Sequence, residues 1–164
     1  KEKFLMEISD LLTIENVITD LRVTSKKQAL QILSKHAANN TGQDERDIFE
    51  ILSQRERLGT TGVGDGRAIP HGHLLGLKKI VGYFARLEKP IDFDSIDDSP
   101  VDLIFLLLAP KGSGAEHLKA LALISRLMRS NVLCEKLRGA NNADALYALL
   151  SRVPQTRSNL RAAS

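Results

Sequence analysis

Apolar residues along this chain follow two patterns, helical spacing and continuous runs. Helical spacing predicts five helices, at about residues 25–39, 44–58, 115–129, 132–137 and 143–150. The run Val101–Ala109 is almost wholly apolar, which is typical of a strand buried on both faces of a sheet. Further strands are predicted at Ile80–Leu87 and, in a shorter form, at Asn16–Ile18.

Strands that alternate with helices predict an α/β domain with helices on both faces of its sheet. The connection from Pro90 to Pro100 has no helical pattern, and a parallel crossover usually carries a helix. The strands that it joins are therefore expected to be antiparallel, so a sheet of about five strands should be mixed parallel/antiparallel. The 164 residues fit a single domain, placed at residues 1–152, followed by a tail at 153–164 expected to be mobile.

Composition narrows the class of protein. Hydrophobic residues make up 43% of the chain and aromatic residues 4%, so the core must be aliphatic. The net charge of +3 comes without a dense basic run carrying interleaved aromatics, so no nucleic-acid partner is expected. The single cysteine, Cys134, excludes a disulfide framework within the chain. Neither a signal peptide nor an apolar run of about 20 residues is present, which predicts a cytoplasmic protein that is not inserted in a membrane.

The stretch from Arg55 to His73 is the most distinctive part of the sequence, because it holds five of the eleven glycines and two of the four histidines. The predicted helix ends at Leu58, and a flexible run follows it and leads to the short apolar segment Ala68–His71. Glycine lets other groups approach the backbone closely, and Pro70 biases the residue before it toward extended geometry. The stretch therefore suits the presentation of His71 to a partner or ligand, although a long surface turn with a structural histidine has the same composition.

His71 and His73 stand two apart, so on an extended segment both side chains point to one face. Such a pair can bind a metal, with Asp65, Glu116 or His117 completing the ligand set. Because His-x-His pairs arise often, this signal is weak, and we expect neither a metal nor another cofactor.

Two glycine-rich runs, Gly62–Gly66 and Lys111–Gly114, superficially resemble phosphate cradles, but neither continues as Gly-Lys-Ser/Thr, so nucleotide binding is not expected. The second run precedes a predicted helix whose N-terminus favours an anion. Ser113 and Glu116 match a capping box there, and His117 lies in the first turn, where the helix dipole favours a neutral imidazole.

Two imidazoles, a helix N-terminus and an arginine at a helix end thus lie near loops that end strands. This set suits a phosphoryl group on a nitrogen. One neutral imidazole would attack phosphorus, the other would donate to a phosphoryl oxygen, and the guanidinium would balance the charge.

The order of residues from Arg55 to Gly72 resembles the active-site signature of the fructose/mannitol-type EIIA domains of the bacterial phosphotransferase system. It is most similar to the nitrogen-regulatory EIIA proteins. The Ala-Ile-Pro-His-Gly core after a glycine-rich run is highly specific. The resemblance continues through Pro90–Asp94 and Pro100–Leu103 to Glu116–Leu118, and so covers nearly the whole chain.

By position, the resemblance implies that His71 is the phosphorylated histidine and reacts through Nε2. It further implies that His117 hydrogen-bonds the phosphoryl group and that Arg55 stabilises its charge. The donor would be a histidine phosphocarrier protein, itself charged from phosphoenolpyruvate through an enzyme I. The chain would then be a cytoplasmic phosphocarrier that regulates target proteins by its phosphorylation state, with ion-transport or sensor-kinase components as candidate targets.

Three other hypotheses remain open at this point. The chain could be the EIIA component of a fructose/mannitol-type uptake system that passes phosphate to an EIIB. It could be a binding module that is never phosphorylated, or a metal-dependent hydrolase built on His71, His73 and His117. Arg67 and His73 depart from the family's usual residues beside the site. These departures leave the details of partner contact and pH response open, but not the identity of His71.

Overall fold

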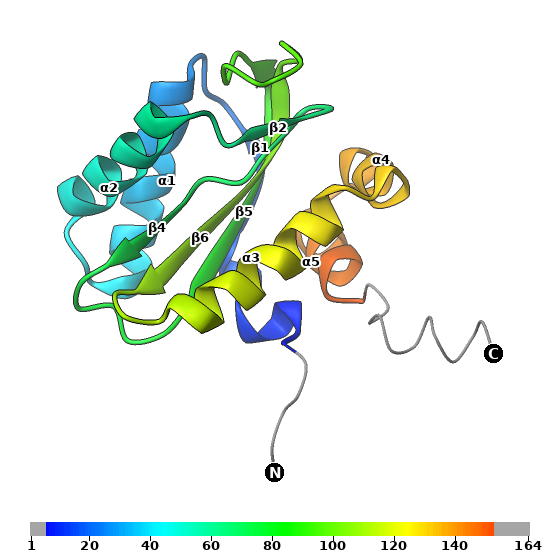
Figure 1. Ribbon diagram of the computed structural model, residues 1–164. Helices are drawn as coiled ribbons and strands as arrows, with labels where there is room; N and C mark the ends of the chain where they lie inside the picture. The colour runs from blue at the N-terminus through cyan, green and yellow to red at the C-terminus, as the bar shows by residue number, and fades with distance from the viewer. Residues whose placement is uncertain (1–5, 153–164) are drawn as a thin grey trace.

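The computed structural model describes residues 6–152 (Figure 1). Its helices are α1 (Lys26–Thr41), α2 (Glu45–Leu58), α3 (Gly114–Met128), α4 (Asn131–Gly139) and α5 (Ala143–Ser151), with the 3-10 turns η1 (Ile8–Asp10) and η2 (Ile14–Asn16). Its strands are β1 (Val17–Leu21), β2 (Gly62–Gly64), β3 (Arg67–Ala68), β4 (His71–Leu74), β5 (Val81–Ile91) and β6 (Val101–Pro110). The predicted tail, at residues 153–164, lies outside the described residues.

The strands form one mixed sheet in the order β1-β5-β6-β3-β2, with β4 also paired to β6. The β5/β6 pair is antiparallel, as the connection without a helical pattern predicted, whereas β1/β5, β3/β6 and β4/β6 are parallel. Both β3 and β4 run along β6, because the segment between them contains Pro70, which has no N–H for the ladder. The mixed α/β fold is therefore confirmed, with six strands where about five were expected.

The glycine-rich stretch is more ordered than the predicted flexible loop. β2 and β3 form a hairpin whose two turn residues, Asp65 and Gly66, have φ values of 53° and 82°. Positive φ at both positions is the geometry of a tight two-residue hairpin turn, which Asp-Gly favours. Strands of two and three residues contain too few alternating positions to be recognised from hydrophobic periodicity.

Helices α1 and α2 cover one face of the sheet, and α3, α4 and α5 cover the other (Figure 1). The central strand β6 serves both layers because successive side chains point to opposite faces. Ile104, Leu106 and Leu108 pack in the α1/α2 layer, whereas Leu103, Phe105 and Leu107 pack in the other. This division explains why the β6 sequence is apolar at nearly every position.

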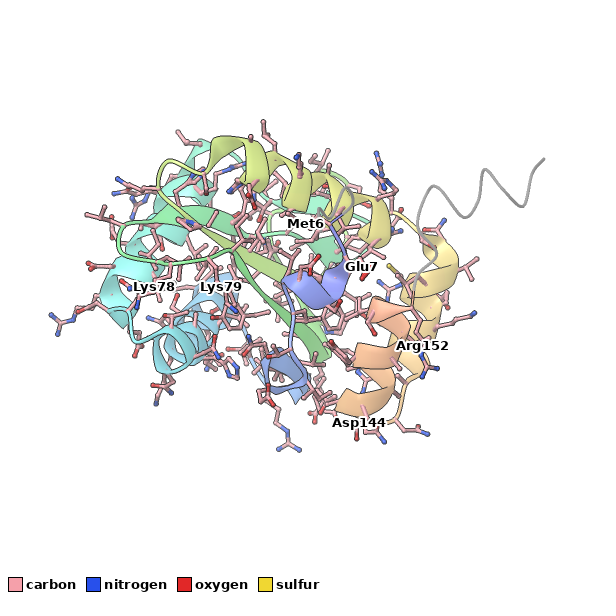
Figure 2. The ribbon with its side chains drawn as sticks, turned by 90° about the horizontal axis from the view of Figure 1, so that it is seen from below. Met6, Glu7, Lys78, Lys79, Asp144 and Arg152 are labelled. Carbon is pink, nitrogen blue, oxygen red and sulfur yellow. The ribbon has the colours of Figure 1, made fainter. Side chains whose placement is uncertain are left out.

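Viewed from below, the side chains mark the two sides of the domain (Figure 2). Lys78 and Lys79, which follow β4, lie on the side of α1 and α2, whereas Asp144 and Arg152 lie on the side of α5. Within residues 6–152, no helix is both long enough and apolar enough to cross a bilayer.

Candidate functional site

His71 begins β4 and is half-buried. Its Nδ1 lies 2.8 Å from the carbonyl oxygen of Ile69, so Nδ1–H donates to that oxygen and the neutral ring keeps its lone pair on Nε2. Burial lowers the pKa of His71, the bond to Ile69 opposes that change, and the charge of Arg55 lowers the pKa further. The net shift of the pKa is downward, which favours the neutral imidazole near pH 7.

His117 lies in the first turn of α3, with only 5% of its surface exposed. Its ring centroid is 5.6 Å from that of His71. Burial, with smaller contributions from His73 and His71, lowers the pKa of His117 to about 4. The ring therefore stays neutral and keeps a single N–H, while its buried Nδ1 has no hydrogen-bond partner in the described structure.

The capping box predicted at the start of α3 is absent. The Ser113 hydroxyl donates to the carbonyl oxygen of Pro110 at 2.5 Å, and no side chain caps the first N–H groups of α3. Because a side-chain cap is missing, this helix end remains suited to an anion.

Arg55 approaches the two histidines from the last turn of α2. Its Nη1 donates to the carbonyl oxygen of Gly59 at 2.8 Å. The helix can lie close to β4 because residue 72 is glycine: a Cβ there would stand 2.5 Å from Cγ2 of Ile51. The glycine next to His71 therefore serves the packing of α2 against the strand.

The three predicted residues, His71, His117 and Arg55, line one hollow of about 840 Å³ between α2, β4 and α3. Two large apolar side chains at this hollow, Leu58 and Leu118, are 86% and 68% exposed. Sequence reasoning missed both leucines, because an exposed leucine on an amphipathic helix looks like any other apolar position. Together they give the hollow an apolar rim, which is typical of a protein-binding surface.

His73 lines the same hollow as His71, in agreement with the predicted common face. Its ring stacks on His117, with centroids 4.2 Å apart and planes inclined by 26°. Neither Asp65 nor Glu116, the carboxylates considered as metal ligands, lines this hollow. Over residues 6–152, no group of three or more His, Cys, Asp or Glu is arranged to hold a metal ion.

Arg67 was expected beside the site but lies elsewhere. It is 4% exposed, and its guanidinium donates to the carbonyl oxygen of Met128 and to Oδ1 of Asn131 and pairs with Asp65 at 3.2 Å. These contacts tie β3 to the junction between α3 and α4. The side chain of Arg67 therefore does not line the hollow, although Arg67 is close to His71 in sequence.

Glu56 is a supporting residue that sequence reasoning missed. Its carboxylate is 6% exposed, lies 2.9 Å from Nζ of Lys26 and accepts from both N–H and O–H of Thr61. These bonds anchor the turn that follows Arg55. Because Lys26 belongs to another helix, no local pattern could have revealed this partner.

Comparisons with known proteins agree with this geometry. Residues 10–153 match the family described as phosphoenolpyruvate-dependent sugar phosphotransferase system, EIIA 2. The chain is 58% identical to a nitrogen regulatory protein of Bradyrhizobium diazoefficiens, over 92% of this chain and 99% of that protein. It is 38% identical to the nitrogen regulatory protein of Escherichia coli, over 89% of this chain and 90% of that protein.

A solved structure supports the same relationship. The nitrogen regulatory protein IIA-Ntr of Neisseria meningitidis matches with a TM-score of 0.83 and 35% identity, over 87% of this chain and 98% of that one. The chain therefore belongs to the EIIA 2 family of the phosphoenolpyruvate-dependent sugar phosphotransferase system, among its nitrogen regulatory proteins.

Proposed function

We propose that the domain at residues 1–152 accepts a phosphoryl group on Nε2 of His71 from a histidine phosphocarrier protein. The observation that carries this proposal is the bond from Nδ1 of His71 to the Ile69 carbonyl, since it leaves the lone pair on Nε2. The same hollow supplies a neutral imidazole at His117 and a guanidinium at Arg55.

In the reaction, the Nε2 lone pair of His71 attacks phosphorus while the phosphorus–nitrogen bond of the donor's phosphohistidine breaks. The donor nitrogen regains its electron pair, so no water or metal is consumed. The single N–H of neutral His117 donates to a phosphoryl oxygen, and Arg55 offsets the negative charge. The lowered pKa of His71 keeps the nucleophile unprotonated near neutral pH.

We further propose that the output is regulation of target proteins. Phosphorylation adds about 1.5 to 2 negative charges at pH 7, here beside the exposed Leu58 and Leu118. A charge placed on an apolar rim changes which surfaces can dock there. The nitrogen regulatory relatives favour this role over sugar uptake, although one relative of 34% identity is a fructose-specific EIIA component of Haloferax volcanii.

The test of this proposal replaces His71, the proposed nucleophile, by alanine. The protein is incubated with phosphoenolpyruvate, enzyme I and the carrier protein, and its intact mass is measured at neutral pH. We expect one acid-labile phosphate on the unaltered protein and none on His71→Ala. His36→Gln is the matched control, because His36 packs against Tyr83 away from the hollow and its replacement should leave phosphorylation intact. Stoichiometric phosphate on His71→Ala would overturn the assignment.

A further inference from the structure

His73 is the exposed imidazole of the hollow. It lies on β4 two residues after His71 and stacks on His117 at a centroid distance of 4.2 Å. His117 beneath it is buried and neutral, so the stack can hold one proton, on His73, without two adjacent imidazolium rings. Because His73 is open to solvent, it can take up that proton directly from water.

The charged and titratable groups around His73 come from three elements. Arg55 and Arg57 face the hollow from α2, His71 from β4 and His117 from α3. Glu56 on α2 acts on His71 electrostatically, but its carboxylate is turned to Lys26 and Thr61. Among the described residues, no carboxylate lines the hollow itself.

In this setting phosphorylation of His71 adds negative charge to the surroundings of His73. In the free protein, the guanidinium groups of Arg55 and Arg57 are the charged side chains that line this hollow. A phosphoryl group on His71 brings a negative charge into the same hollow and would attract a proton on His73. By reciprocity, whatever the phosphoryl group contributes to proton binding at His73, the proton contributes equally to phosphorylation of His71.

We propose that His73 is a proton-dependent positioning residue of the phosphoryl site: a proton on His73 and a phosphoryl group on His71 stabilise each other across the hollow. This inference rests on the proposed function of His71. The proton comes from solvent and stays on His73, so the transfer chemistry at Nε2 of His71 is unchanged. The phosphorylated form gains this support when His73 holds a proton and loses it when the proton leaves.

The experiment measures the equilibrium partition of phosphate between the carrier protein and three proteins: unaltered, His73→Gln and His73→Lys. Partition is read by intact mass at pH 6, 7 and 8. Glutamine removes the charge and lysine makes it permanent, while both remove the ring stack. The donor is common to all three measurements, so its own titration cancels in ratios of equilibrium constants.

We expect the equilibrium constant for phosphorylation of the unaltered protein to exceed that of His73→Gln about fivefold at the lowest pH, and this excess to shrink as pH rises. The equilibrium constant for phosphorylation of His73→Lys should exceed that of His73→Gln by a similar factor at every pH. A ratio of unaltered protein to His73→Gln that is constant from pH 6 to 8 would overturn this inference alone. No phosphate on the unaltered protein would instead overturn the proposed function, and this inference with it.

A second measurement follows the His73 ring directly. Its titration midpoint, observed by NMR, should rise when His71 is phosphorylated. A midpoint that is equal in both forms would contradict the coupling, whatever the partition shows.

Discussion

Arg55 and Arg67 belong to the same conspicuous stretch of sequence, yet the fold uses them differently. Arg67 is buried and its guanidinium is occupied by Met128, Asn131 and Asp65. Arg55 is half-buried at the edge of the hollow and donates to one backbone oxygen. A buried guanidinium with several partners cannot turn to a ligand without losing those hydrogen bonds. Arg55 has a single backbone partner, so it can reach a ligand at the cost of one hydrogen bond at most. The saturation of hydrogen bonds therefore separates the structural arginine from the candidate functional one.

The largest effect is expected on removing the structural arginine. Arg67→Met should lower the free energy of unfolding by about 3 kcal/mol, since the Met128 carbonyl and the Asn131 side chain lose a charged donor. Urea denaturation measures this loss. The molecules that remain folded should still accept phosphate at a rate within about threefold of the unaltered protein. An unchanged free energy of unfolding would show that burial and a full set of hydrogen bonds do not make Arg67 a structural residue.

The second effect is expected on the functional arginine. Arg55→Gln should slow phosphoryl uptake about 100-fold, because a guanidinium that balances transition-state charge is lost. Its free energy of unfolding should change by less than about 0.5 kcal/mol. Quenched-flow transfer from the phosphorylated carrier protein gives the rate. A large loss of stability with an unchanged rate would reverse the roles of the two arginines.

His117 sharpens the comparison, because it is buried like Arg67 but lacks a partner at Nδ1. Its pKa is about 4 in the folded protein, so the unfolded chain takes up the proton first as pH falls below about 6.5. Stability is therefore complete near pH 7 and should fall by about 2 kcal/mol at pH 5. His117→Gln should lose most of this pH dependence in urea denaturation. An equal dependence in both proteins would assign it to another group.

The smallest effect is expected at a surface arginine. Arg22 is 83% exposed and pairs with Glu88 at 3.0 Å, outside the hollow. Arg22→Gln should change stability by less than about 0.5 kcal/mol and leave phosphoryl uptake unaltered. It is the control for Arg55→Gln in both assays, and a slow uptake here would mean that general positive charge, not Arg55, assists the transfer.

Local pattern explains the parts of the fold that were predictable. The β6 run identified a strand with two buried faces, and the helical repeats located the five helices to within a few residues. The short strands β2, β3 and β4 were missed, because they are stabilised by pairing rather than by their own periodicity. β3 and β4 pair with the distant β6, and β2 pairs with β3. The Ser113 capping box failed for a related reason: the hydroxyl found a closer partner in the preceding turn.

The sequence by itself determined the residue types of the site, the common face of His71 and His73, and the family to which these residues point. Only the tertiary structure decided which side chains share the hollow. It placed the ring centroids of His117 and His71 5.6 Å apart and turned Arg67 away to the α3–α4 junction. The physical reason is that a strand or helix pattern sets the face on which a side chain lies. The partner that the side chain finds there depends on which distant element packs against that face, and on the space that a residue such as Gly72 leaves for it.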